Sequence, residues 1–179
     1  MPAPLSAYIP QSTRDRGPLL TWSMVVACSL FLLAAIVGAP VALAQGHSAL
    51  AQTIYATFSH LCHQLDERSF FIAGHKFAVC ARCTGIYVGF AGAALCYPLL
   101  CSLRQTDTPP RKWLFVAAAP LALDVSLTVF GIWQNTHLSR FLTGALLGAV
   151  SVFYIMPGLI DLSLRNWRSW FSRKQMPVH

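Results

Sequence analysis

Four long apolar runs, separated by short polar segments, constrain the fold of this chain more than any other feature. A hydrocarbon core about 30 Å thick is crossed by about 20 helical residues, and each run reaches that length. The runs are 19–44, 80–103, 113–133 and 141–164. Charged residues make up 11% of the chain, against about 25% in an average soluble domain. The sequence therefore predicts an all-α, polytopic membrane protein, a four-helix transmembrane bundle.

The basic residues between these runs predict the orientation. With both termini in the cytoplasm, nine Lys and Arg residues fall on the inner side and four on the outer side, as the positive-inside rule requires. The outer four are Arg68, Lys76, Arg82 and Arg140. We expect a multi-pass protein of the bacterial cytoplasmic (inner) membrane, N-in and C-in. The lipid bilayer is its expected partner, and a homo-oligomer or a larger membrane complex is left open. Because the net charge of +7 is not gathered on one patch, no nucleic-acid partner is expected.

The two ends of the chain are predicted to lie outside the membrane domain, which covers residues 19–164. Residues 1–18 are polar and rich in proline and predict a disordered cytoplasmic lead, whereas residues 165–179 form a basic cytoplasmic tail. Residues 42–45, Ala-Leu-Ala-Gln, also resemble a signal-peptide cleavage site, although the preceding apolar run exceeds the usual h-region of about 7–15 residues. Either alternative leaves residues 60–83 outside.

Residues 60–83, here called the Cys/His loop, carry three cysteines and three histidines within 24 residues. Cys80 and Cys83 form a C-x-x-C pair where the second span begins. The free N–H groups and the dipole of a helix N-terminus favour thiolate there, and Arg82 adds a positive charge. With Cys62 and one histidine, the pair would complete a tetrahedral Cys3His site, which is typical of zinc or another transition metal. The predicted ligands are Cys62, His63, Cys80 and Cys83, with His60 and His75 as reserves.

Two other uses of these cysteines stay open. Membrane proteins of the DsbB-type and vitamin K epoxide reductase families pass electrons from an outward C-x-x-C pair to a quinone, and the similarity to this chain is architectural. In that alternative Cys80 and Cys83 are the redox pair, with Cys62 as resolving thiol. Those families use a second outer cysteine pair, whereas this chain offers Cys62 alone, which favours a metal. A structural disulfide is the third interpretation. No nucleotide-binding or hydrolase motif is present, so catalytic activity is not assigned.

A carboxylate lies inside the third span. Asp124 near the middle of a span destabilises the protein by several kcal/mol unless it is paired or protonated. We predict an intramembrane charge pair between Asp124 and Arg140, at the mouth of the fourth span, with Arg82 as the alternative partner. Transport around Asp124 is a weaker hypothesis, because four spans leave little room for alternating access.

Small residues recur every fourth position in two spans. Gly85 and Gly89 in the second span, and Gly144 and Gly148 in the fourth, form small-xxx-small faces that allow close helix packing. Packing of the second span on the fourth would bring the C-x-x-C end beside Arg140.

The string C-H-Q…R-S-F…G…V-C-A-R-C-T-G-I-Y-x-G-F, followed by P-L-A-L-D and R-F-L-T-G-x-x-x-G, resembles a predicted bacterial membrane protein family, domain of unknown function 2085 (DUF2085). The resemblance covers roughly residues 55–160. It implies a membrane location and implies no activity. The matching residues are Cys62, His63, Gln64, Arg68, Ser69, Phe70, Gly74, Cys80, Arg82, Cys83, Thr84, Gly85, Tyr87, Gly89, Asp124, Arg140, Phe141, Thr143 and Gly144.

Overall fold

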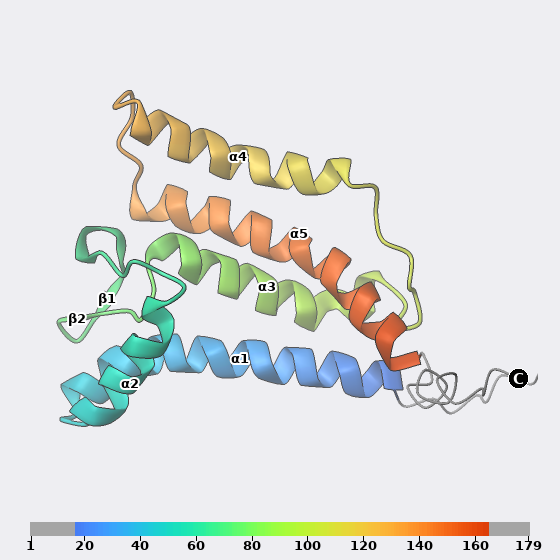
Figure 1. Cartoon of the computed structure of the whole chain (residues 1–179), viewed down its shortest axis with the longest axis horizontal. Coiled ribbons are helices and arrows are strands. Elements are labelled where there is room, and N and C mark those ends of the chain that lie inside the picture. Colours follow the sequence, from blue (N-terminus) through green and yellow to red (C-terminus); the bar gives the residue numbers. More distant parts are fainter. Residues whose placement is uncertain (1–16, 165–179) are drawn as a thin grey trace, which may run out of the picture.

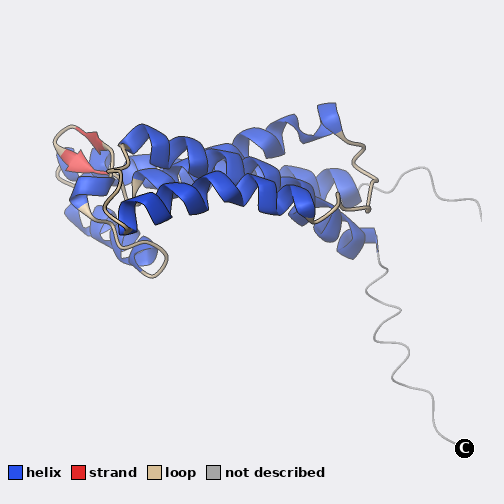
Figure 2. Ribbon diagram, turned by 90° about the horizontal axis from the view of Figure 1, so that it is seen from above, coloured by secondary structure: helices blue, strands red, loops and turns tan. Residues whose placement is uncertain are grey.

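The computed structural model describes residues 17–164, which form helices and one small hairpin (Figures 1 and 2). The long helices are α1 (Gly17–Ala44), α3 (Ala81–Leu100), α4 (Lys112–Val129) and α5 (His137–Leu164). The shorter elements are α2 (Ser48–Ser59), the 3-10 turn η1 (Asp66–Arg68) and the strands β1 (Phe71–Ile72) and β2 (His75–Lys76). The predicted basic tail and all but the last two residues of the predicted lead lie outside the described residues.

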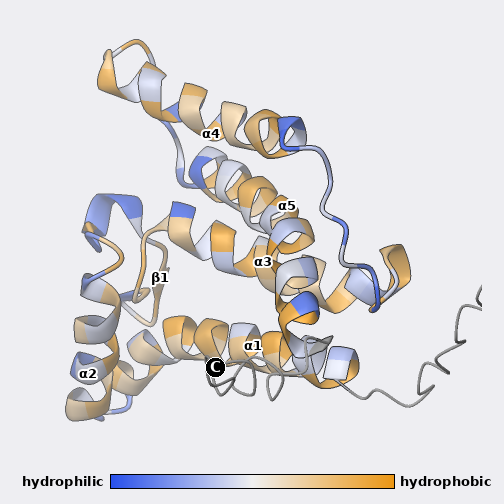
Figure 3. Ribbon diagram, turned by 45° about the vertical axis from the view of Figure 1, so that its right-hand side comes forward, coloured by the Kyte–Doolittle hydropathy of each residue, from blue (hydrophilic) through white to orange (hydrophobic). Residues whose placement is uncertain are grey.

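The four long helices are long and apolar enough to cross a membrane, which confirms the predicted fold class. Figure 3 shows hydrophilic residues mainly at helix ends and in the connections between them. Two boundaries differ from the predicted spans. The fourth span begins at His137 rather than 141, because the Thr136 hydroxyl accepts a hydrogen bond from the Ser139 amide (3.1 Å) and caps the helix. The third span ends at Val129, since Gly131 with φ 67° turns the chain out of the helix.

The long helices lie side by side in the order α4, α5, α3, α1 (Figure 1). Contacts between α3 and α5 are the most extensive, α1 packs against both, and α4 packs chiefly against α5. Much of α4 is therefore exposed, with Phe115 at 73% and Leu123 at 62%. A face this apolar suits acyl chains rather than water.

The glycines predicted to pack α3 against α5 do so from both sides. A Cβ at Gly85 would lie 2.1 Å from the Phe141 carbonyl oxygen, and one at Gly89 2.0 Å from that of Ala145. Positions 144 and 148 meet the backbone of α3 equally closely. No side chain fits at such distances, so glycine alone permits this approach. The first turn of α3 is thereby held against the first turns of α5.

The Cys/His loop closes the end of the bundle at which α3 and α5 begin. The hairpin pairs Phe71 with Lys76 and Ile72 with His75 in antiparallel register, and α2 packs on α1. The start of α1 and the end of α5 lie together at the opposite end (Figure 1), where Gly17 approaches Ser163. One end of the bundle therefore carries the loop and the other carries both ends of the described chain.

Candidate metal centre

Gln64 positions the first cysteine. Its backbone adopts φ 51°, in the left-handed region that side chains other than glycine rarely enter. Its side-chain amide nitrogen, Nε2, donates to the carbonyl oxygens of Tyr55 and Ala78, both at 2.8 Å. Gln64 thus ties α2 to the segment that leads into α3. Cys62, whose amide donates to Phe58 (2.9 Å), is held between these two segments.

Lys76 and the first helix brace the same segment. The Lys76 ammonium donates to the Gln64 carbonyl oxygen (2.8 Å) and to the Asp66 carboxylate (2.6 Å). The Tyr55 hydroxyl donates to the Lys76 carbonyl oxygen. The Ala78 amide donates to the Ile36 carbonyl oxygen of α1 (3.3 Å). Because these bonds reach α1 and α2, the loop is fixed without any disulfide among the described residues.

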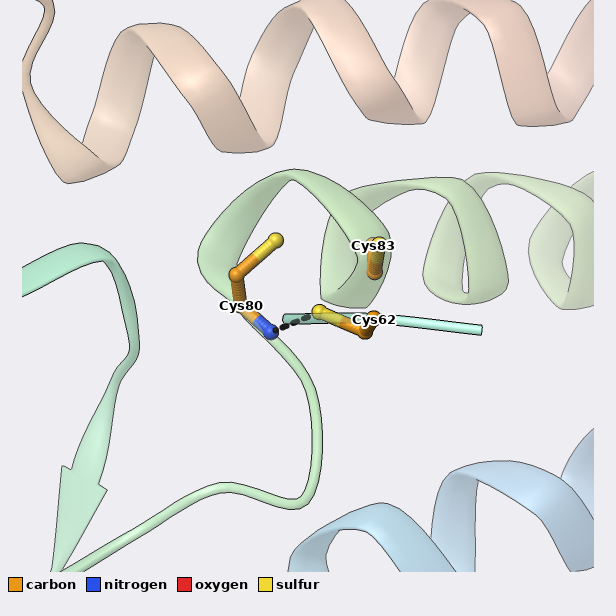
Figure 4. A group of neighbouring side chains, drawn as sticks. All are labelled: Cys62, Cys80 and Cys83. Carbon is orange, nitrogen blue, oxygen red and sulfur yellow. Dashed lines mark hydrogen bonds between the residues drawn. The ribbon is translucent and has the colours of Figure 1, made fainter. Parts of the chain in front are cut away.

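Three cysteines converge at the start of α3, and we call Cys62, Cys80 and Cys83 the cysteine cluster (Figure 4). Their sulfur atoms all lie within 4.8 Å of one another, as the sequence predicted in outline. Cys80 occupies the N-cap position and Cys83 the first turn of α3. The Cys80 amide donates to the Cys62 sulfur (3.2 Å), and all three thiols are free. Cys62 is buried, at 7% exposed, whereas Cys80 and Cys83 are half-buried.

The cluster favours a thiolate at Cys80. Hydrogen bonds from the thiols of Cys62 and Cys83 hold the pKa of Cys80 far below its usual range, against the opposing effect of burial. Amide hydrogen bonds from Cys83 and Arg82 act in the same direction. Thiolate is the form in which cysteine binds metals and attacks disulfides. The arrangement therefore favours the deprotonated form of one of the three sulfur ligands.

The histidines do not join the cluster. Among the described residues, the group of ligand atoms close enough to hold a metal ion contains the three cysteines and no histidine. His63 is exposed, because Cys62 and Gln64 on either side turn inward. Of the reserves, His60 is exposed, and His75 lines a separate pocket beside Lys76. The structure thus brings the three predicted cysteines together and leaves the predicted histidine outside the group, and a histidine ligand stays a prediction.

The intramembrane carboxylate has a different direct partner from the one predicted. Asp124 pairs with the Arg82 guanidinium at 2.6 Å, and its side chain is 9% exposed. Arg140 donates through Nε to the Asn135 amide oxygen (2.7 Å), and Asn135 donates in turn to Asp124 (2.8 Å). Ser139 supplies a further hydrogen bond at 3.0 Å. Arg82 can reach Asp124 because α5 packs against both α3 and α4. Asn135 bonds to both Asp124 and Arg140 and so lies between them.

Asn135 and Ser139 were not among the predicted site residues. Asn135 lies in the connection between α4 and α5, and Ser139 lies in the first turn of α5. Polar residues are common at such positions, so neither drew notice in the sequence. The signal that could have identified them is the charge of Asp124, since a buried carboxylate takes every donor within reach.

Comparison with protein families matches residues 62–154 to DUF2085, described as a predicted membrane protein. The chain belongs to this family. The matched region begins at the first cysteine of the cluster and includes Asp124 and Arg140, so the family covers both features of the site. It also confirms the resemblance expected from the sequence, over nearly the predicted range.

Two archaeal relatives match this chain over most of their own length. An uncharacterized protein of Methanocaldococcus jannaschii is 38% identical over 115 residues, which are 64% of this chain and 74% of the relative. An uncharacterized protein of Methanothermobacter thermautotrophicus is 34% identical over 87 residues, 49% of this chain and 77% of the relative. No solved structure matches this chain. A membrane protein is shown, whereas the bacterial inner membrane and the N-in, C-in orientation stay predictions.

Proposed function

We propose that this membrane protein binds zinc or another transition metal at the cysteine cluster. The observation that carries the proposal is the grouping of three sulfur atoms within 4.8 Å of one another. Zinc–sulfur bonds of about 2.3 Å in a tetrahedral site require sulfur atoms about 3.8 Å apart. Small side-chain rotations would close the difference.

The chemistry of the site supports a metal over a disulfide. One disulfide would use only two of the three thiols, whereas a cation between the sulfur atoms could be bound by all three. The amide of Cys80 donates to the Cys62 sulfur, an interaction that stabilises a thiolate ligand. Because the described residues supply three ligands, the fourth position would be open to water or an external ligand, as in catalytic rather than structural zinc sites.

Metal analysis of anaerobically purified full-length protein tests this directly. We expect about one metal ion per chain, released together with the appearance of three reactive thiols. Cys62→Ser and Cys83→Ser should each weaken metal binding by more than about 100-fold, since even loss of an outer-shell partner lowers affinity about 10- to 100-fold. Cys96→Ser, on an exposed face of α3, should retain the metal. Reduced wild-type protein that takes up no metal from a zinc-supplemented buffer would contradict the proposal.

We further propose that the cluster faces the outside of the cell, with both termini inside. The distribution of basic residues supports this orientation, as does the position of the cluster at the end opposite Gly17 and Ser163. After reduction and removal of metal, a membrane-impermeant maleimide should label Cys80 in intact cells. Labelling that appears only after the membrane is permeabilised would reverse the topology, and a reporter fused after Lys174 provides an independent check.

A thiol–quinone oxidoreductase is the second candidate function, and one cavity favours it. An apolar cavity of about 420 Å³ is lined by Tyr87, Phe90 and Cys28 between α3 and α1. Tyr87 also packs against the core beside Cys80 and Cys83. In this reaction the two thiols of Cys80 and Cys83 would form one disulfide, and two electrons and two protons would reduce a quinone to a quinol. Stoichiometric reduction of an added soluble quinone by the reduced, metal-free protein would favour this function over the metal centre.

A further inference from the structure

Three arginines, Arg68, Arg82 and Arg140, lie at the end of the bundle that carries the cysteine cluster, and one of them forms an ion pair with a carboxylate. Arg82 pairs with Asp124. Arg140 donates Nε to the uncharged amide of Asn135. Within residues 17–164, neither Arg140 nor Arg68 forms an ion pair. Two guanidinium groups at this end of the bundle therefore lack an acidic partner.

Phe70 places the segment that carries Arg68 against the first turn of α5, which carries Arg140. Its ring lies 6.0 Å from that of Phe141 and 5.8 Å from that of His137, measured between centroids. Arg68 is two residues before Phe70, and Arg140 immediately precedes Phe141. The positive charges of Arg68 and Arg82 both lie near enough to act on Arg140. The two unpaired guanidinium groups therefore share one region although they repel each other.

The surrounding helix ends add positive charge to this region. The N-termini of α3 and α5 both lie here, and each contributes a partial positive charge from its helix dipole. Asp124 and a thiolate on Cys80 offset two of the three guanidinium charges, and the third is formally matched by Glu67, which precedes Arg68 in η1 but forms no ion pair among the described residues. A divalent metal on three thiolates would carry the same single negative charge as that thiolate, so this balance does not depend on the metal.

We propose that Arg68 and Arg140 together bind a phosphate group beside the cysteine cluster. A guanidinium presents a planar fork of N–H donors that matches the oxygens of a phosphate. Arg68 is exposed and Arg140 is half-buried, so a ligand would enter from the loop side and be held at the bundle. The pair lies at the ends of membrane-spanning helices, the depth of lipid headgroups. The phosphate is therefore either a free anion or part of an anionic lipid.

Thermal unfolding and calorimetric titration of the full-length protein in neutral detergent separate the two sources. One arm adds inorganic phosphate, the second adds chloride at matched ionic strength, and the third adds a short-chain phosphatidylglycerol. Stabilisation by phosphate beyond chloride assigns a free anion, and stabilisation by the lipid alone assigns a headgroup. Equal effects in all three arms would overturn the proposal, because non-specific screening explains them.

Variants identify the residues that bind the ligand. Arg68→Gln should weaken binding about tenfold or more, the loss expected of one charge-assisted bidentate contact. Because no side-chain hydrogen bond of Arg68 is found within the described chain, this variant should still fold. Arg104→Gln, an exposed arginine at the other end of α3, is the matched control and should bind normally. Unchanged binding in Arg68→Gln, or equal loss in both variants, would refute the site. Repeating the titration in Cys62→Ser keeps the outcome separate from that of the metal proposal.

Discussion

Replacing Gly89 with leucine should prevent α3 from packing against α5. A Cβ at this position would lie 2.0 Å from the Ala145 carbonyl oxygen and 2.8 Å from its Cα. Both atoms belong to the backbone of α5, so no flexible side chain can move aside. Over-packing usually destabilises a core by about 1–3 kcal/mol, and a backbone clash requires the helices to separate. We expect a loss of about 3 kcal/mol or more in the free energy of unfolding, measured by thermal or SDS-induced unfolding in detergent.

Gly92→Leu provides the matched control. Gly92 lies one turn further along the same helix, and a Cβ there meets nothing within 4 Å. Its substitution by leucine should leave the midpoint of unfolding nearly unchanged. Equal stability of the two variants would show that α3 and α5 are not packed as the structure has them.

The same interface connects helix packing to the cysteine cluster. A Cβ at Gly144 would lie 2.3 Å from the Arg82 carbonyl oxygen, so the turn that carries Arg82 and Cys83 rests directly on α5. Separation of these helices would also displace Cys83 from the other two sulfur atoms. We therefore infer that the glycines serve the site as well as the fold.

The parts of the fold that depend on hydropathy and residue size could be predicted from the sequence. The apolar runs identify the spans because an apolar segment of about 20 residues crosses the hydrocarbon core as a helix. The spacing of Gly85 and Gly89 identifies a close contact because four residues return to the same helix face. The C-x-x-C pair likewise lies within one turn wherever α3 begins. Each of these inferences needs a local pattern and no knowledge of which helix lies next to which.

The predictions that the structure does not match depend on the direction of single side chains. His63 adjoins Cys62 in the sequence, but the left-handed backbone at Gln64 turns the glutamine inward and leaves the histidine exposed. A sequence pattern does not contain that dihedral angle. The partner of Asp124 depends on which arginine the helix packing brings closer. It also depends on Asn135, which forms hydrogen bonds to both Asp124 and Arg140 and lies between them. Neither the direction of His63 nor the partner of Asp124 follows from the separation of residues along the sequence.

Asp124→Asn should destabilise the protein by about 3–5 kcal/mol, because removal of one partner leaves the other charge of a buried pair uncompensated. The carboxylate accepts hydrogen bonds from Arg82, Asn135 and Ser139, and an amide can replace only part of these. Asp107→Asn, in the exposed connection between α3 and α4, is the matched control and should change the midpoint of thermal unfolding little.

Double-mutant cycles then decide which arginine is coupled to the carboxylate. Residues in one hydrogen-bonded network show interaction energies of about 0.5–3 kcal/mol. The cycle of Asp124→Asn with Arg82→Gln should fall near the upper end of that range, since these groups touch at 2.6 Å. The cycle with Arg140→Gln should give a smaller value, because Asn135 transmits the interaction between them. A larger coupling to Arg140 than to Arg82 would show that the first turns of α3 and α5 are arranged differently, and would separate Asp124 from the helix that carries the cysteine pair.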